Sequence, residues 1–137
     1  MIDLRDPTLP ADAVRTAMAL LPHPEGGHYR EIWRDPPQDG SRGAASTIHF
    51  MLAAGERSAS HRVDAAEIWG WNAGGPLRLT IGAETVTLGP NLAAGETLQA
   101  IVPATVWHDA EPLGAWTLVT CLVAPAFTFE GFELAKG

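Results

Sequence analysis

The chain has 137 residues, the size of one domain, and its 46% of hydrophobic residues is enough for one core. Its net charge of −7 disfavours nucleic acids and anionic membrane surfaces as partners, because both attract basic patches. No apolar run approaches the roughly 20 residues of a membrane-spanning helix, and the first residues lack the apolar core of a signal peptide. We therefore expect one cytoplasmic domain over residues 1–137 that binds neither nucleic acid nor membrane.

A short helix is predicted near the N-terminus, over about residues 8–21. Apolar residues recur there at helical spacing, at Leu9, Ala13, Ala17 and Leu20. Pro10 suits the first turn of a helix, where its missing N–H costs no hydrogen bond, and Pro22 ends the pattern.

Almost all of the chain after this helix is predicted to form short β-strands. Seven segments are rich in β-branched and aromatic residues and are separated by Gly, Pro, Asn and Asp. They are residues 29–33, 46–52, 67–71, 77–81, 85–88, 98–102 and 116–123. Gly82 and Ala83 suggest a hairpin turn between two of them. Such strands are typical of a sandwich or a closed barrel, which we expect over about residues 28–134.

One segment, Gly55–Gly74, carries a histidine and a glutamate six residues apart. If the chain turns near residues 64–66, His61 and Glu67 meet inside the barrel, and imidazole with carboxylate is a sensible start of a Zn, Fe or Mn site. His108 follows a predicted turn and would complete a set of two histidines and a carboxylate. This set is found in non-haem iron centres and in some catalytic zinc sites.

The same residues also permit a site without metal. Glu67 would then form a salt bridge with an arginine such as Arg57 or Arg62, because a carboxylate inside a barrel needs a partner. Alternatively, His61 and Glu67 would act together as an acid–base pair. The residues alone leave these alternatives open.

Two strand residues are candidates for contact with a ligand. His49 lies in the middle of a predicted strand. If its face lines the barrel, His49 binds the ligand or adds a fourth metal ligand, and otherwise it lies on the outer surface. Trp69 shares the face of Glu67 and is either a wall of the pocket or part of the core.

A glycine-rich loop, Pro22–Gly27, precedes the first long strand. It either presents His23, Glu25 and Arg30 to a ligand or is a rigid turn between the helix and the barrel, in which Glu25 caps exposed backbone amides. The strand that follows has two faces, and only one of them can point inward. One face carries His28, Arg30 and Ile32, and the other carries Tyr29, Glu31 and Trp33.

The proposed metal ligands fall at the spacing of known motifs. Gly55, His61, Glu67 and Gly74 match the first cupin motif, and Pro103, Thr105 and His108 follow the core of the second. Val63 stands where the first motif has its second histidine, so that one ligand of the full cupin site is missing. Thr105 stands in place of the glycine of the second motif.

From about Leu20 to Leu134 the chain resembles the DUF985 (Cupin_5) family of small single-domain cupins. The resemblance is carried by the run LPHPEGGHYRE from Leu21, by the strand STIHFML from Ser46, and by APAFTFEGFEL from Ala124. It implies an all-β fold, a single cupin barrel (a double-stranded β-helix or jelly roll) with a short N-terminal helix, and a homodimer.

For function we expect a small-molecule ligand in the barrel, and three alternatives remain. The first is an enzyme for a sugar or sugar-acid derivative, of the isomerase, epimerase or lyase type, with His61 or His108 as base and Glu67 as ligand or orienting group. A divalent metal (Zn, Fe, Mn or Ni) would assist it, or it would use no cofactor. The second is a binding protein with a vestigial metal site. The third is an Fe(II)-dependent oxygenase.

Overall fold

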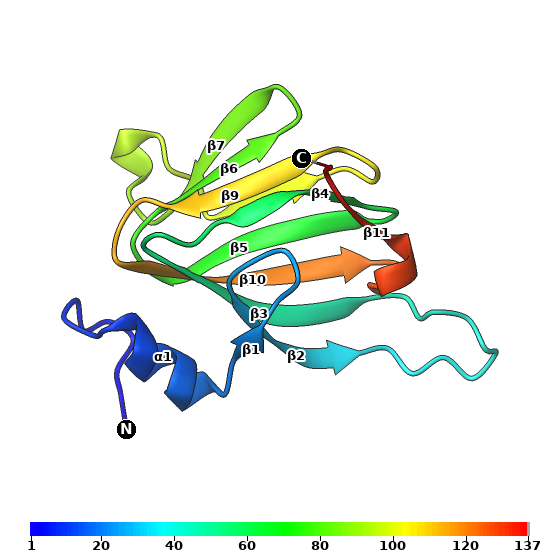
Figure 1. Cartoon of the computed structure of the whole chain (residues 1–137), viewed down its shortest axis with the longest axis horizontal. Helices are drawn as coiled ribbons and strands as arrows, with labels where there is room; N and C mark the ends of the chain where they lie inside the picture. Colours follow the sequence, from blue (N-terminus) through cyan, green and yellow to red (C-terminus); the bar gives the residue numbers. More distant parts are fainter. Residues whose placement is uncertain (137) are drawn as a thin grey trace.

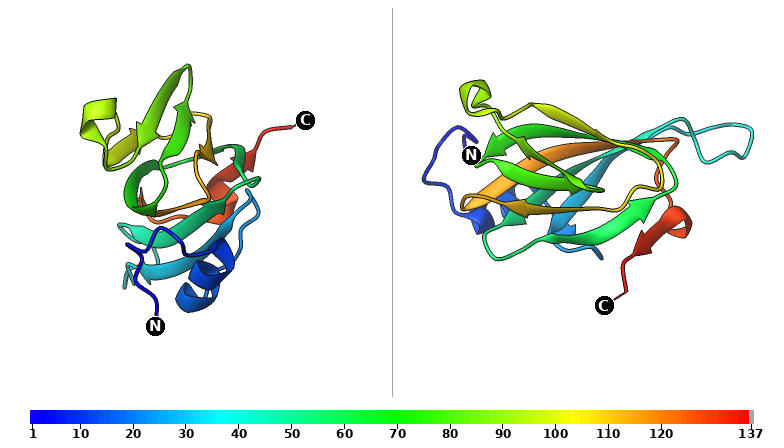
Figure 2. Two further views of the ribbon diagram at one scale, coloured as in Figure 1. Left: turned by 90° about the vertical axis from the view of Figure 1, so that its left-hand side faces the viewer. Right: turned by 90° about the horizontal axis from the view of Figure 1, so that it is seen from above.

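The computed structural model describes residues 1–136, so Gly137, the last residue of the predicted domain, lies outside the described residues. Two antiparallel sheets pack face to face, and one short α-helix lies beside them (Figures 1 and 2). The predicted all-β fold with a short N-terminal helix is confirmed.

The chain alternates between the two sheets for most of its length. The six-stranded sheet has the order β1 (Leu21–Pro22), β2 (His28–Arg34), β3 (Ser46–Ala53), β10 (Trp116–Ala124), β5 (Ala66–Gly74) and β8 (Gln99–Val102). The five-stranded sheet has the order β11 (Phe132–Leu134), β4 (Ser58–Val63), β9 (His108–Pro112), β6 (Leu77–Ile81) and β7 (Glu84–Leu88). Two 3-10 turns, η1 (Leu92–Ala94) and η2 (Phe129–Gly131), lie in the connections. This alternation places β4 and β5, neighbours in sequence, on opposite walls of the interior.

The N-terminal helix α1 (Ala11–Met18) is shorter at both ends than the predicted range of residues 8–21. It ends because Ala19 takes a left-handed conformation, with φ of 54°, and its N–H bonds to the carbonyl oxygen of Thr16 at 3.2 Å. Leu21 and Pro22 then leave the helical path and pair with β2 as the edge strand β1.

The main core lies between the two sheets. Its buried residues are Phe50, Leu52, Trp69, Leu77, Leu79, Leu88, Val102, Ala110, Val119 and Cys121. Cys121 is buried, and burial raises the pKa of its thiol. A second cluster forms outside the six-stranded sheet, where Val14 of α1 packs with Met51 and Leu118. The two clusters show that alternate residues of β3 and β10 serve opposite sides of this sheet.

The two glycines that frame the first motif segment both adopt positive φ, +88° at Gly55 and +85° at Gly74. Their surroundings differ. A Cβ atom at Gly74 would lie 2.4 Å from the carbonyl oxygen of Trp116, whereas a Cβ atom at Gly55 would have no neighbour within 4 Å. Of the two, only Gly74 therefore combines a positive φ with a close approach of the neighbouring strand β10.

This pair gives a test of the packing of β5 on β10. Gly55→Ala is expected to lower the free energy of unfolding by about 1 kcal/mol, the cost of an L side chain in the left-handed region. Gly74→Ala is expected to lower it by about 1–3 kcal/mol more, because the new methyl group is overpacked against Trp116. Urea unfolding of both variants measures the difference, and equal losses would contradict the packing described.

Candidate metal centre

Strands of opposite sheets bring His61, Glu67 and His108 together. His61 on β4 and His108 on β9 are direct cross-strand partners, and their ring centroids lie 4.0 Å apart. Glu67 on β5 faces them from the other sheet, with its Oε2 atom 2.7 Å from Nε2 of His108. One ligand atom of each residue lies within 4.8 Å of the other two, and all three residues are buried.

Backbone carbonyl groups orient both imidazole rings. Nδ1 of His61 lies 2.8 Å from the carbonyl oxygen of Ala59, and Nδ1 of His108 lies 3.1 Å from that of Val106. Because a carbonyl oxygen only accepts, we assign the proton of each neutral ring to Nδ1, which leaves a lone pair on Nε2. This is the arrangement of metal-binding histidines, whose second nitrogen donates to a carbonyl or carboxylate.

The contact between Glu67 and His108 requires a cation. Their Oε2 and Nε2 atoms are close but not aligned for a hydrogen bond, and both are buried without another partner. A carboxylate oxygen and an imidazole lone pair at this distance repel each other unless a proton or a metal ion neutralises them. Burial lowers the pKa of His108, but the Glu67 carboxylate more than offsets this, and the net pKa is raised. The donor set fits a divalent metal, which would take the place of that proton.

His61 differs electrostatically from His108. Burial and the neighbouring His108 lower the pKa of His61 to about 4, so its ring is neutral at neutral pH. A neutral imidazole is the form that binds a metal.

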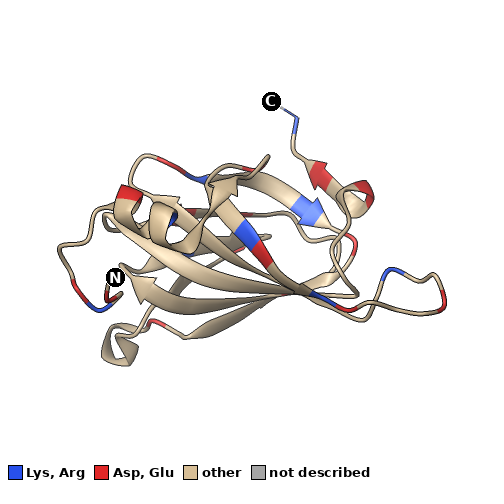
Figure 3. Cartoon of the chain, turned by 90° about the horizontal axis from the view of Figure 1, so that it is seen from below, with Lys and Arg blue, Asp and Glu red and all other residues tan. Residues whose placement is uncertain are grey.

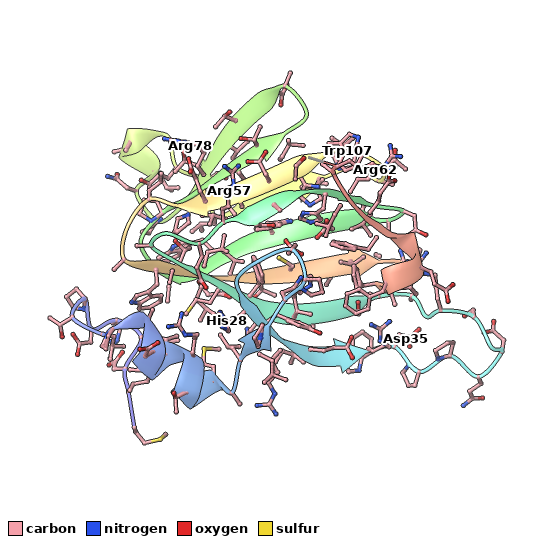
Figure 4. All side chains as sticks on the ribbon, in the orientation of Figure 1. His28, Asp35, Arg57, Arg62, Arg78 and Trp107 are labelled. Atoms are coloured by element: carbon pink, nitrogen blue, oxygen red, sulfur yellow. The ribbon has the colours of Figure 1, made fainter. Side chains whose placement is uncertain are left out.

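No arginine neutralises Glu67 among residues 1–136. Arg57 forms a salt bridge with Asp109 at 3.1 Å. Arg62 bonds to Glu133 at 2.9 Å and lies over the ring of Trp107, 4.7 Å from its centroid (Figure 4). The alternative in which Glu67 pairs with one of these arginines is therefore wrong.

A cavity of about 460 Å³ opens beside the three residues. His61 and Glu67 line it, whereas His108 lies behind them with a fully buried side chain. Val63, in the place of the missing motif histidine, also lines the cavity. The volume is within the range of small-molecule sites, and the cavity adjoins the candidate metal ligands His61 and Glu67.

A further carboxyl group, that of Glu25, lies beside His61. Its Oε2 atom accepts a hydrogen bond from the Ser58 hydroxyl and lies 3.5 Å from Nε2 of His61. Burial raises the pKa of Glu25 to about 8, partly opposed by the Ser58 hydrogen bond, so the carboxyl group is largely protonated at neutral pH.

The loop that carries Glu25 is also fixed in place. The Glu25 N–H donates to Nδ1 of His23 at 3.1 Å, and its carbonyl oxygen accepts from the Ala59 N–H at 2.7 Å. Burial lowers the pKa of His23 to about 4, so its 3.3 Å approach to Glu25 is not an ion pair. The loop is therefore a rigid turn, as one of the two alternatives predicted. His23 and Glu25 line the cavity, whereas Arg30 does not.

Two expected ligand contacts lie elsewhere. Ile48 and Phe50 point into the interior, so His49 between them is on the outer face of the six-stranded sheet, beside Arg30 and Thr120. His49 is thus not placed to supply a fourth metal ligand. Trp69 is in the core, where its ring packs edge-on against His108 at 6.0 Å between centroids, and it does not line the cavity.

The prediction that β2 alternates regularly between an inward and an outward face is wrong, because the strand contains a β-bulge. The register with β3 slips between Glu31 and Trp33, so that Glu31 pairs with Ile48 while Arg34 pairs with Ser46. Glu31 and Arg34 both line the cavity as a result, although residues three apart in a regular strand face opposite ways. Arg30 is exposed on the outer face instead. No residue pattern in the sequence signals this bulge.

Thr105 takes the conformation that the glycine of the second motif would take. Its φ is +68°, in the left-handed region, and its N–H donates to the carbonyl oxygen of Val63 at 2.8 Å. The turn before His108 is thereby tied to β4, the strand that carries His61.

Comparisons with known proteins agree with the fold. The family model of the Cupin superfamily (DUF985) matches residues 13–135. The chain belongs to the Cupin_5 family. A protein from Shewanella oneidensis is 37% identical, with a TM-score of 0.89 over 94% of this chain and 86% of that one. A hypothetical protein from Leishmania major is 28% identical, with a TM-score of 0.86 over 93% and 88%.

More distant structures show the fold alone. Oxalate decarboxylase from Bacillus subtilis is 18% identical, with a TM-score of 0.64 over 82% of this cupin and 29% of that chain. The comparison with curated proteins found no match. Within residues 1–136, no helix is both long and apolar enough to span a bilayer. Acidic and basic residues are interspersed in the view of Figure 3.

The buried carboxyl group of Glu25 predicts a pH dependence of stability in the metal-free protein. Between its ordinary pKa of 4.5 and about 8, the unfolded chain ionises Glu25 while the folded chain keeps it protonated. Stability is therefore lost as pH rises through this window, by roughly 1.4 kcal/mol for each pKa unit. Glu25→Gln removes this loss, so its unfolding free energy relative to wild type should increase with pH across the window.

Denaturant unfolding of both proteins after chelation measures this difference. Glu31→Gln, at a half-exposed carboxyl group on the same cavity, is the matched control and should follow the wild-type pH profile. Parallel profiles for Glu25→Gln and wild type would show that Glu25 ionises normally in the fold.

Proposed function

We propose that this cupin binds a divalent metal ion (Zn, Fe, Mn or Ni) through His61, Glu67 and His108, and uses it to bind and convert a small polar molecule. The observation that carries the proposal is the convergence, within 4.8 Å, of one ligand atom from each of His61, Glu67 and His108, with both Nδ1 atoms held by carbonyl groups. Three protein ligands leave coordination positions open for a substrate.

The bound metal would polarise a carbonyl or hydroxyl oxygen of the substrate. In the metal-free protein Glu25 holds a proton beside His61. Ser58 positions this carboxyl group, which is a candidate to give or take a proton at a neighbouring atom of the substrate. Tyr29, Phe127 and other aromatic residues form an apolar side of the cavity. These groups favour isomerisation, epimerisation or elimination in a sugar or sugar-acid derivative.

Two other functions use the same cavity. An Fe(II)-dependent oxygenase is compatible with two histidines and a carboxylate. A binding protein without catalysis is compatible with Val63, which removes one ligand of the full cupin site. Exchange of substrate hydrogen with solvent deuterium, without oxygen uptake, indicates isomerisation, epimerisation or elimination. Iron-dependent oxygen uptake indicates the oxygenase. Ligand binding without turnover indicates the binding protein.

Metal content tests the central part of the proposal. Tag-free wild-type protein, reconstituted with iron, manganese, nickel or zinc, is expected to hold close to one metal ion per chain by elemental mass spectrometry. His61→Ala and His108→Ala should each lose it, because two protein ligands bind a divalent ion weakly.

The matched control is His49→Ala, which removes an imidazole from the outer face of the same molecule. It should retain metal like the wild type. Wild-type protein that stays metal-free after reconstitution, or metal that persists in both His61→Ala and His108→Ala, would refute the metal centre. Loss of metal in His49→Ala would place the ion elsewhere.

The homodimer and the cytoplasmic location also stay predictions. The outer face of the six-stranded sheet exposes Trp33 and Ile101 in one cross-strand row, and a second copy would pack there. Light scattering is expected to give a dimer for the wild type and a monomer for Ile101→Glu. A monomeric wild type would contradict the prediction.

A further inference from the structure

The cavity contains one cationic side chain among its described lining residues, Arg34. Three carboxyl groups, of Glu25, Glu31 and Glu67, line the same space. Arg34 reaches the cavity because of the β2 bulge, which turns it to the same side as Glu31. Bulges next to active sites commonly re-aim a side chain in this way.

The guanidinium group of Arg34 makes two hydrogen bonds within the protein. Nη1 donates to the carbonyl oxygen of Phe127 at 2.6 Å, which fixes the group against the chain that follows β10. Nη2 donates to Glu31 at 2.6 Å. Nη2 and Nε together form the edge of an arginine that binds a carboxylate with two parallel hydrogen bonds.

Glu31 is a weak competitor for that edge. Its side chain is 43% exposed and that of Arg34 is 37% exposed. Salt bridges between such exposed groups contribute little to stability. A ligand carboxylate can therefore replace Glu31 at small cost, whereas the Phe127 carbonyl keeps the guanidinium group in place.

The strand register relates Arg34 to the metal centre. Arg34 pairs with Ser46, Ser46 with Val123, and Val123 with Glu67, so all four lie in one row across β2, β3, β10 and β5. Three strand intervals of about 4.8 Å separate the Cα atoms of Arg34 and Glu67 by roughly 14 Å, and both side chains project into the gap. A ligand that meets both groups is therefore short.

We propose that Arg34 is the anion-binding residue of this cavity, and that the molecule it takes is a short carboxylic acid. The carboxylate displaces Glu31 from Arg34, and a hydroxyl or carbonyl oxygen at the other end of the molecule meets the His61–Glu67–His108 centre. The inference deepens the proposed function and rests on it for the second contact only. The first contact is independent of the metal.

The test uses matched pairs of hydroxy acids and neutral polyols or sugars. Threonate with threitol, gluconate with glucitol, and galacturonate with galactose are titrated into ¹⁵N-labelled protein and followed by amide shifts of the residues that line the cavity. At least one acid is expected to bind, about 10-fold or more tightly than its neutral partner, because only the acid makes charge-assisted hydrogen bonds to Arg34. Arg34→Gln should weaken that acid about 10-fold or more, and Arg34→Lys less, since an ammonium group keeps the charge without the planar fork.

Two further variants make the role of Arg34 specific. Glu31→Gln should tighten binding of the acid several-fold, because it removes the internal competitor. Arg78→Gln removes an arginine with a similar exposed salt bridge, to Glu111 on the other sheet, and should leave the affinity unchanged (Figure 4).

The inference is overturned if none of the three acids shifts the cavity residues, if a neutral partner binds as tightly as its acid, or if Arg34→Gln leaves the affinity unchanged. Metal content is measured in the same samples and should be equal in wild type and Arg34→Gln. Acid binding that depends on Arg34 in a protein without metal would keep this inference and refute the metal centre. A protein that holds metal but binds none of the acids would keep the metal centre and refute this inference.

Discussion

Two imidazole rings and a carboxylate are held against one another in the interior of this cupin by strands of opposite sheets. The two histidines are cross-strand partners in the five-stranded sheet, so the pairing of β4 with β9 sets their spacing. Glu67 reaches them from β5, so the packing of the two sheets sets the third distance. Moving a charged group into such an interior costs several kcal/mol unless a partner of opposite charge is present. The folded state therefore depends on a cation, proton or metal, at this point.

The second carboxyl group in the same cavity follows from this constraint. Glu25 is desolvated, and the Glu67 carboxylate nearby also disfavours its ionised form. The two glutamates consequently differ in role: Glu67 is paired with His108, and Glu25 holds its proton beside His61. The rigid loop around Glu25 keeps this difference in place, since Ser58 and Ala59 of β4 both bond to it. One strand therefore positions both a candidate metal ligand and a candidate acid–base group.

The mouth of the cavity shows how one extra residue changes the chemistry of a site. Without the bulge in β2, the strand would alternate regularly, and Trp33 would take the inward position next to Glu31. With the bulge, Trp33 is exposed on the outer face and a guanidinium group enters the cavity. A site whose described lining has three carboxyl groups and no other arginine or lysine thereby gains a cation. The row through Ser46 and Val123 links this cation to Glu67 of the candidate metal centre.

Much of this protein was determined by the sequence by itself. Seven of the described strands and the hairpin at Gly82 were predicted from composition and turn residues, whereas β1, β4, β9 and β11 were not among the predicted segments. The family was identified by its motifs, and His61, Glu67 and His108 were singled out by their spacing. These signals are local, so they are present in the chain before it folds. The sequence also located Glu25, although both alternatives for its loop remained open.

Only the tertiary structure decided which face of each strand points inward. Alternation divides a strand into two faces but does not say which one meets the opposite sheet. His49 and Arg30 were therefore candidates for ligand contact, and both lie on the outer face. The tertiary structure also decided the limits of the helix and the bulge that brings in Arg34. It likewise decided the partners of Arg57 and Arg62. Each depends on hydrogen bonds or contacts with a segment distant in sequence, and that information exists only once the strands have paired.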